Sequence, residues 1–167
     1  MSIRVSLAGF LAAAAILVSL PAGADDVIKV RLMGSDLAAD IARATVKSCR
    51  AKGYQVAAVV LDRAGDIMAA QRDTLARRHT LEIAERKAGL VVLSGADSGE
   101  MRAQRGDIRA ELNEMRGLIV MEGGIQIRAA GSLIGAVGVS GAPGGDIDAA
   151  CARDGLAAVQ DRLDFVD

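Results

Sequence analysis

Apolar and polar positions in the first half of the chain alternate in blocks that predict helices and strands. A helix is expected from Ser35 or Asp36 to about Lys52, ended by Gly53. Valine-rich residues from Tyr54 to Leu61 and a second apolar run from Ile67 to Gln71 indicate two strands joined by a turn. A basic loop then leads to a helix from about Thr80 to Leu93.

The second half continues with charged, helix-prone residues and then returns to strands. Two short helices broken near Gly106 are expected between Ala96 and Met115, followed by a short strand from Leu118 to Met121. Strands over residues 123–128 and 132–140 form a glycine-rich hairpin, and Asp146 is expected to cap a final helix to about Leu163. Hairpin connections imply an antiparallel sheet of about five strands flanked by helices, which is an α+β fold.

The first 24 residues have the features of a cleaved secretory signal peptide. Arg4 precedes an apolar run from Val5 to Leu20, and Ala22-Gly23-Ala24 provides a small-residue cleavage site. The run is too short for a stable membrane span. We therefore expect a signal peptide at 1–24, a single domain at 25–167, a periplasmic or secreted location and no membrane span after cleavage.

The charge of the mature chain argues against nucleic-acid binding. Removing Arg4 leaves 19 Lys and Arg against 21 Asp and Glu, a net charge of −2. Tyr54 and Phe165 are the only aromatic residues in that part of the chain. Contacts to phosphates need clustered cations and base stacking needs aromatic platforms, so nucleic acid is excluded as a partner.

Two cysteines, Cys49 and Cys151, lie in segments predicted to be helical. In an oxidising compartment a disulfide is the default for a pair that can meet, and packing of the first helix against the last would bring these two together. Two buried free thiols are an equally good reading, because the sequence does not supply their separation.

Seven short segments spread along the chain match the pattern of one protein family. They are Val59–Gly65, Arg72–Asp73, His79–Thr80, Lys87–Ala88, Gly123–Ile127, Gly135–Asp146 and Cys151–Ala152. Together they closely resemble the GlcG/HbpS family of haem-binding proteins, also called the haem-degrading domain family, over about residues 36–163. The resemblance implies a profilin-like α/β sandwich, homo-oligomeric assembly and, in secreted members, binding of haem or iron linked to redox stress.

Three departures from that pattern lie on or near the ligand face that the resemblance implies. Arg77-Arg78 stand where related sequences often have Gly-Pro, and Gly89-Leu90 stand where they often have Tyr-Thr. Gln126 replaces a frequent proline. These changes affect the transfer of ligand chemistry more than the transfer of the fold.

His79 is the single histidine and the best candidate for an iron ligand. One histidine and two dispersed cysteines do not suit a closed zinc site, whereas haem iron can be held by one protein ligand. Arg72, Arg77 and Arg78 are candidate partners for the haem propionates. The alternative is an exposed residue at the start of a helix, with basic neighbours.

Other candidate groups follow along the same helix and in the glycine hairpin. Glu82 lies one turn after His79, so the two could hold an iron ion with water, although a solvated acidic face explains Glu82 as well. Lys87 is expected to pair with a carboxylate or with an anionic ligand. Gly123 and Gly124 form a tight turn or open the backbone to a ligand.

The resemblance, the signal peptide and the single histidine favour a secreted protein that binds haem or a related tetrapyrrole, or iron. Two alternatives remain at this point. One is a non-catalytic accessory module that binds another small molecule in a periplasmic metabolic system. The other is an enzyme that degrades haem, for which the residues provide no acid–base pair.

Overall fold

The computed structural model describes residues 28–164, so the expected signal peptide lies outside the described residues. The elements are α1 (Ser35–Ala51), β1 (Ala57–Asp62), β2 (Ile67–Arg72), α2 (His79–Ser94), α3 (Ser98–Gln104), the 3-10 turn η1 (Gly106–Ile108), α4 (Arg109–Glu114), β3 (Gly124–Ala129), β4 (Ser132–Ser140), α5 (Gly145–Ala157) and α6 (Gln160–Asp164). None of the helices between residues 28 and 164 is long and apolar enough to cross a membrane.

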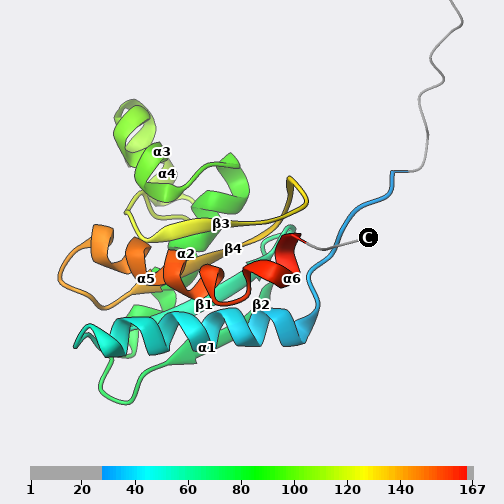
Figure 1. Cartoon of the computed structure of the whole chain (residues 1–167). Helices are drawn as coiled ribbons and strands as arrows, with labels where there is room; N and C mark the ends of the chain where they lie inside the picture. Colours follow the sequence, from blue (N-terminus) through cyan, green and yellow to red (C-terminus); the bar gives the residue numbers. More distant parts are fainter. Residues whose placement is uncertain (1–27, 165–167) are drawn as a thin grey trace, which may run out of the picture.

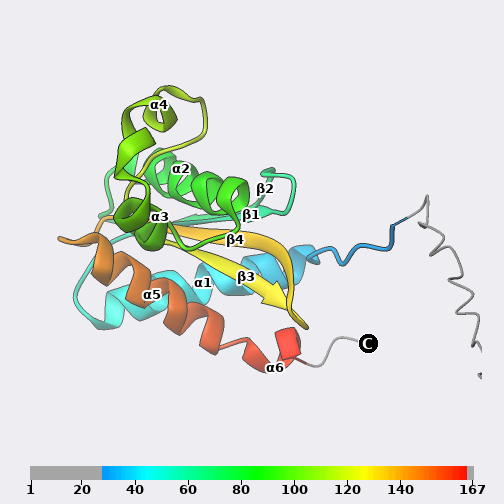
Figure 2. The same ribbon diagram turned by 90° about the horizontal axis from the view of Figure 1, so that it is seen from above.

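Four antiparallel strands form a single sheet in the order β2-β1-β4-β3. Helices α1 and α5 cover one face, and α2 covers the other (Figures 1 and 2). The central strand β1 is buried on both faces, which explains its unbroken run of apolar residues. The expected α+β fold, with an antiparallel sheet between helices, is confirmed.

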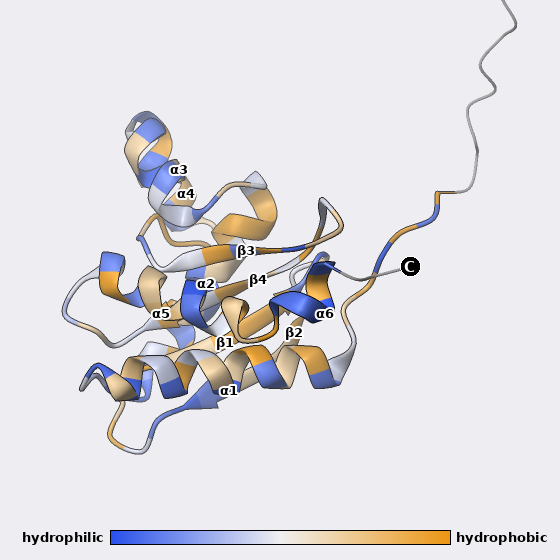
Figure 3. Ribbon diagram, in the orientation of Figure 1, coloured by the Kyte–Doolittle hydropathy of each residue, from blue (hydrophilic) through white to orange (hydrophobic). Residues whose placement is uncertain are grey.

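Alternate residues of β1 belong to two separate hydrophobic clusters. Ala58 and Val60 pack with α1 and α5, whereas Val59 and Leu61 pack with α2. The central strands are correspondingly hydrophobic in Figure 3, while the helices carry both hydrophilic and hydrophobic residues. A third, smaller cluster contains Leu90 and lies between α2 and the segment that follows α4.

The expected fifth strand, from Leu118 to Met121, does not form. Leu118 and Val120 are buried in the third cluster, so every second residue of this segment is buried, as in a strand. However, the Ile119 amide donates to Arg86 O at 3.2 Å and the Val120 amide donates to Asn113 Oδ1 at 2.8 Å. The backbone is therefore satisfied by a helix carbonyl and a side chain instead of a neighbouring strand.

The single helix expected from Asp146 to about Leu163 forms as two helices, and the first of them, α5, begins differently from the expectation. Its N-cap is Gly144 in extended conformation, with no side-chain capping bond, and Asp146 lies exposed in the first turn. The helix ends at Ala157, where turn bonds such as Val159 N to Leu156 O replace the regular helical pattern. A separate short helix, α6, then continues to Asp164.

Glycines allow α2 to lie directly on the sheet. A β-carbon at Gly138 would stand 1.9 Å from Ala84 O, and one at Gly124, its partner in the β-ladder, would stand 2.5 Å from Lys87 O. On the outer side of α2, a β-carbon at Gly89 would stand 2.2 Å from the carbonyl oxygen of Gly117. Gly89, one of the departures from the family pattern, thus lets the segment after α4 pack closely against α2.

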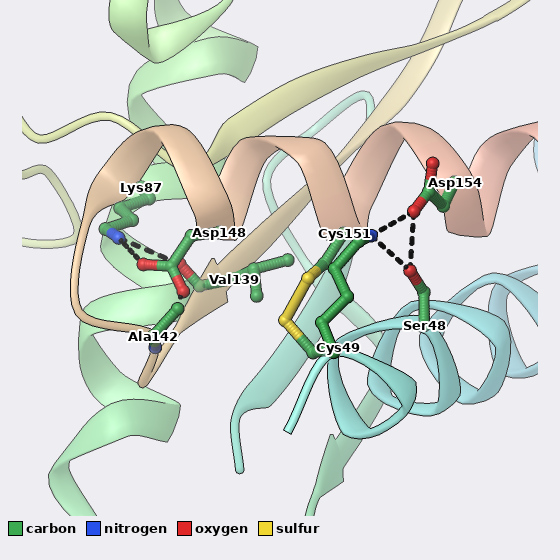
Figure 4. The surroundings of a disulfide bond; sticks show 9 residues. Ser48, Cys49, Lys87, Val139, Ala142, Asp148, Cys151 and Asp154 are labelled. Carbon is green, nitrogen blue, oxygen red and sulfur yellow. Dashed lines mark hydrogen bonds and ion pairs between the residues drawn. A yellow bond between two sulfur atoms is a disulfide. The ribbon is translucent and has the colours of Figure 1, made fainter. Parts of the chain in front are cut away.

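A disulfide joins Cys49 of α1 to Cys151 of α5 (Figure 4). Both residues are fully buried and are 102 positions apart in the sequence. Asp154 accepts hydrogen bonds from Ser48, at 2.7 Å, and from Lys52 beside the bridge. Of the two readings of the cysteines, the structure supports the bridge.

The disulfide is expected to stabilise the fold through its long closed loop. Replacing both residues, as Cys49→Ser/Cys151→Ser, should lower the free energy of unfolding by about 2–5 kcal/mol. Urea denaturation of the oxidised wild type and the double variant measures this difference. The reduced wild type is the control and should approach the variant, whereas equal midpoints for all three samples would contradict the expectation.

Gly89→Ala should destabilise the protein although alanine normally favours a helix. The added methyl group must displace the Gly117 carbonyl, at a cost of about 1–3 kcal/mol. Gly99→Ala in α3 is the matched control, because its β-carbon would meet the flexible side chain of Glu122 at 3.1 Å. Thermal unfolding of both variants provides the comparison. An unfolding temperature of Gly89→Ala equal to that of the wild type would contradict the expectation.

Candidate functional site

The loop between β2 and α2 presents cations and a histidine on the surface. Arg72, Arg77, Arg78 and His79 are all exposed. Leu75, at the outer part of the same loop, has 76% of its surface exposed. We call these five residues the His79 surface; it combines an imidazole, three guanidinium groups and one large apolar side chain.

A buried carboxylate anchors the loop at its beginning. Asp73 accepts hydrogen bonds at 2.9 and 2.8 Å from the Arg50 guanidinium of α1, and its side chain is 2% exposed. Its oxygen Oδ1 also accepts the Thr74 amide, while the Asp73 amide donates to Val56 O. The hydrogen bonds from Arg50 lower the pKa of Asp73, so the carboxylate stays ionised at neutral pH.

The end of the loop is held by contacts with the start of α2. Arg72 Nη1 donates to the carbonyl oxygen of the buried Ala76. The Thr80 hydroxyl donates to Arg77 O at 2.6 Å, and the Thr80 amide donates to the same oxygen at 3.0 Å. His79 is the first residue of α2, directly after a loop whose two ends are both fixed.

Glu82 follows His79 by three residues on α2, a spacing that places the two side chains on neighbouring positions of the helix surface. Glu82 is exposed, and its carboxylate lies 3.9 Å from Arg86 Nη1. Among residues 28–164, no three or more His, Cys, Asp or Glu side chains gather in a way that could hold a metal ion. Iron held by His79 and Glu82 would need its other ligands from water or from another chain.

Lys87 lies away from the His79 surface, more than two turns along α2. Its Nζ is buried and donates to Asp148 Oδ2 at 2.8 Å and to Val139 O at 2.9 Å (Figure 4). Asp148 in turn accepts the Ala142 amide at 3.1 Å. Burial raises the pKa of Asp148, and the positive charge of Lys87 opposes that rise.

Gly123 lies next to this ion pair, and Gly124 lies against the backbone of Lys87. A β-carbon at Gly123 would lie 2.7 Å from Lys87 Nζ and 2.9 Å from Asp148 Cβ. Gly123 also has a φ of +124°, a backbone conformation that favours glycine. Both Gly123 and Gly124 are buried, so in this structure they make room for Lys87 and α2.

The structure thus divides the residues singled out from the sequence into two groups. The three arginines, His79 and Glu82 lie exposed around the start of α2, while Lys87, Gly123 and Gly124 are buried where α2 packs against the start of β3. Sequence reasoning missed Leu75 in the first group and Asp148 in the second. An apolar residue between Thr74 and Ala76 gave no periodic signal, and Asp148 is 61 positions from Lys87.

A match to a family profile identifies the relatives of this chain. The profile described as haem-degrading protein HbpS-like matches residues 33–157, which include the whole sheet and helices α1 to α5. The chain belongs to the HbpS-like family. No curated protein matches it in sequence.

Several solved structures have the same fold as this chain. A crystal structure of HbpS shares 29% identity with a TM-score of 0.75, covering 84% of this chain and 99% of that one. The Klebsiella pneumoniae protein ORFY, of the DUF336 family, shares 24% identity with a TM-score of 0.74, covering 82% and 97%. PduOC in complex with haem shares 22% identity with a TM-score of 0.68, covering 77% and 95%. The last two likenesses concern the fold alone.

Removing Lys87 should expose how strongly the buried pair is coupled. Lys87→Met leaves Asp148 buried without its cation and should cost about 3–5 kcal/mol of unfolding free energy. Lys87→Met/Asp148→Asn removes the charge as well and should be more stable than Lys87→Met alone. Urea denaturation of both variants tests this order, and a double variant no more stable than the single one would refute it.

The same single variant should also gain stability as the pH falls. Without Lys87, burial raises the folded-state pKa of Asp148 above its unfolded value, so the folded protein takes up the proton more readily. The unfolding free energy of Lys87→Met, relative to Lys87→Met/Asp148→Asn, should therefore be largest near and below the unfolded pKa. It should decrease as the pH rises through the folded pKa.

Proposed function

We propose that this HbpS-like protein binds haem at the His79 surface after export from the cytoplasm. The observation that carries the proposal is the exposure of His79 beside Arg77, Arg78 and Leu75 on a loop fixed at both ends. An imidazole can ligate haem iron, guanidinium groups can pair with propionates, and an apolar side chain can pack against the macrocycle. The donor set therefore fits the group.

Family membership supports the same ligand. The family is described as haem-degrading, and the related PduOC was crystallised with haem. When bound, haem would supply redox-active iron, which is the basis for the expected link to redox stress. The protein's own part in this proposal is to bind and orient the group: His79 ligates the iron while the arginines hold the propionates.

The disulfide supports an exported location. Structural disulfides persist in the periplasm and outside the cell and are rare in the cytosol. The Cys49–Cys151 bridge is buried inside the domain, as expected of a structural bridge. Together with the signal-like residues at the start of the sequence, it favours a periplasmic or secreted protein.

Haem is a better candidate than a free iron ion. His79 and Glu82 provide two neighbouring ligands, which is too few for a closed site on one chain, whereas the porphyrin itself supplies four nitrogens to its iron. We therefore assign His79 as the ligand of haem iron, with Glu82 next to it on the helix. A small-molecule accessory role and haem breakdown become outcomes that the test distinguishes.

A hemin titration followed by the Soret band tests this proposal. The wild type should bind saturably, and His79→Ala should shift the band position and weaken binding by at least about tenfold. Arg77→Gln/Arg78→Gln should weaken binding while keeping the wild-type band position, because the iron ligand is unchanged. Arg63→Gln/Arg109→Gln, which removes two exposed arginines elsewhere, is the matched control and should bind as the wild type does.

Three results would overturn the proposal or extend it. An identical titration for His79→Ala would remove His79 as the ligand, and absence of saturable binding by the wild type would favour the accessory-module alternative. Repeating the titration with reductant and oxygen separates binding from breakdown. Loss of the Soret band with release of iron and a bilin would establish turnover in addition to binding.

A further inference from the structure

The residues before α1 form one wall of a pocket on the domain, and we call residues 28–32 the arm. The arm has no regular secondary structure. Its base is held by Met33, which is buried in the hydrophobic cluster that joins α1 and α5 to the sheet. A β-carbon at Gly135 of β4 would stand 3.0 Å from Met33 Cε. The arm therefore starts from a fixed position beside β4.

Two turns of the sheet provide the other walls. Asp62 pairs with Gly135 in the antiparallel ladder of β1 and β4, which brings Arg63 to the same end of the sheet as the start of β4. Figures 1 and 2 show the arm, the β1–β2 turn and the β3–β4 turn at this end of the molecule. The pocket has a volume of about 550 Å³, and we call it the arm pocket; it is lined by residues 28–31, Arg63, Ser132 and Leu133.

Both turns are held by hydrogen bonds of their own. Asp62 Oδ1 accepts the Ala64 amide at 2.8 Å and the Asp66 amide at 3.0 Å, so the β1–β2 turn closes around this carboxylate. In the β3–β4 turn, the Ala130 amide donates to Leu163 O at 3.2 Å, which attaches the turn to α6. The walls made by the sheet are therefore preformed.

The charges of the arm pocket are all positive. Lys29, Arg31 and Arg63 line it, and no Asp or Glu does. Among residues 28–164, none of these three cations forms an ion pair. Asp62 and Asp66 are the acids closest to Arg63 in the sequence, and neither lines the pocket. Like charges around one concavity repel one another, so a bound anion is stabilised there.

The remaining lining residues indicate what kind of anion fits. Ile28, Val30 and Leu133 add apolar side chains, and Ser132 adds a hydroxyl. Sites for small molecules have volumes of about 300–1,000 Å³ and combine apolar walls with a few polar groups. A guanidinium pairs with a carboxylate or a phosphate through two parallel hydrogen bonds. An oxyanion carried on an apolar body matches both parts of this lining.

We infer that the arm pocket binds a small organic anion, with its carboxylate or phosphate group held by the three cations and its apolar body packed on the three apolar side chains. The Ser132 hydroxyl donates to the same oxyanion. This site shares no residue with the His79 surface. It also contains no His, Cys, Met or Tyr, the side chains that commonly ligate haem iron, so its ligand is a second small molecule.

Isothermal titration calorimetry with octanoate and octyl phosphate tests the inference. At least one of these anions should bind saturably, and the stronger of the two identifies the preferred oxyanion. Acetate, which lacks the apolar body, and octanol, which lacks the charge, should bind at least about tenfold more weakly. Added salt should weaken binding, because it screens exposed charges. Absence of saturable binding by both anions, or equally strong binding of acetate or octanol, would overturn the inference.

Two variants separate the arm pocket from the His79 surface. Arg31→Gln/Arg63→Gln should weaken binding of the preferred anion at least about tenfold and leave the hemin titration unchanged. Arg77→Gln/Arg78→Gln is the matched control and should bind the anion as the wild type does. Wild-type affinity in the first variant, or weakened binding in the control, would place the anion elsewhere. Because the calorimetry uses ligand-free protein, a failure of hemin binding leaves this test intact.

Ile28→Ser/Val30→Ser tests the apolar wall of the arm pocket. It keeps all three cations, so binding of the preferred octyl anion should weaken by at least about threefold while the weak binding of acetate stays the same. Circular dichroism should show the wild-type signal for every variant, because the substituted side chains are exposed. Wild-type affinity for the octyl anion in this variant would contradict packing of its apolar body on the arm.

Discussion

Lys87 and Asp148 come from helices on opposite faces of the sheet and meet just before the start of β3, where Gly123 has no side chain to separate them. Their ion pair joins α2 to α5, and the second bond from Lys87 attaches both to Val139 of β4. Because both groups are buried, removing either partner leaves an uncompensated charge and lowers the free energy of unfolding strongly. The position of α2 relative to α5 and β4 therefore depends on this contact and on the glycines that make room for it.

The His79 surface lies at the edge of that framework. Arg50 and Asp73 attach the loop to α1, and Thr80 connects its end to α2, so both helical layers contribute to its position. The side chains of Arg77, Arg78 and His79 themselves are exposed. This separation means that Arg77, Arg78 and His79 can change with little effect on folding, whereas Asp73 cannot.

Local signals in the sequence predicted most elements correctly. The unbroken apolar run of β1 indicated a buried strand, and Gly53 stands at positive φ after α1, as a helix-ending glycine should. The strand predicted from Leu118 to Met121 was wrong because burial of every second residue is common to strands and to extended segments packed on a helix. Only the hydrogen-bond partners of Ile119 and Val120 distinguish the two.

Features that depend on distant residues could not be predicted in the same way. The partner of Lys87 lies in another helix, and the reason for Gly89 lies in the carbonyl of Gly117. The exposure of Leu75 depends on where the buried Asp73 and Ala76 anchor their loop. Sequence patterns identified the basic loop with its histidine, but its apolar residue and its fixed ends are visible only in the fold.

The bridge between Cys49 and Cys151 has a further consequence for a protein that meets proteases. Every peptide bond between these residues, including those of the exposed α3–α4 region, lies inside the covalent loop. A single backbone cut there leaves two fragments that remain one covalent molecule, with the sheet held between them. The two fragments of such a nicked protein stay covalently linked until the disulfide is reduced, whereas the same cut would divide an unbridged chain.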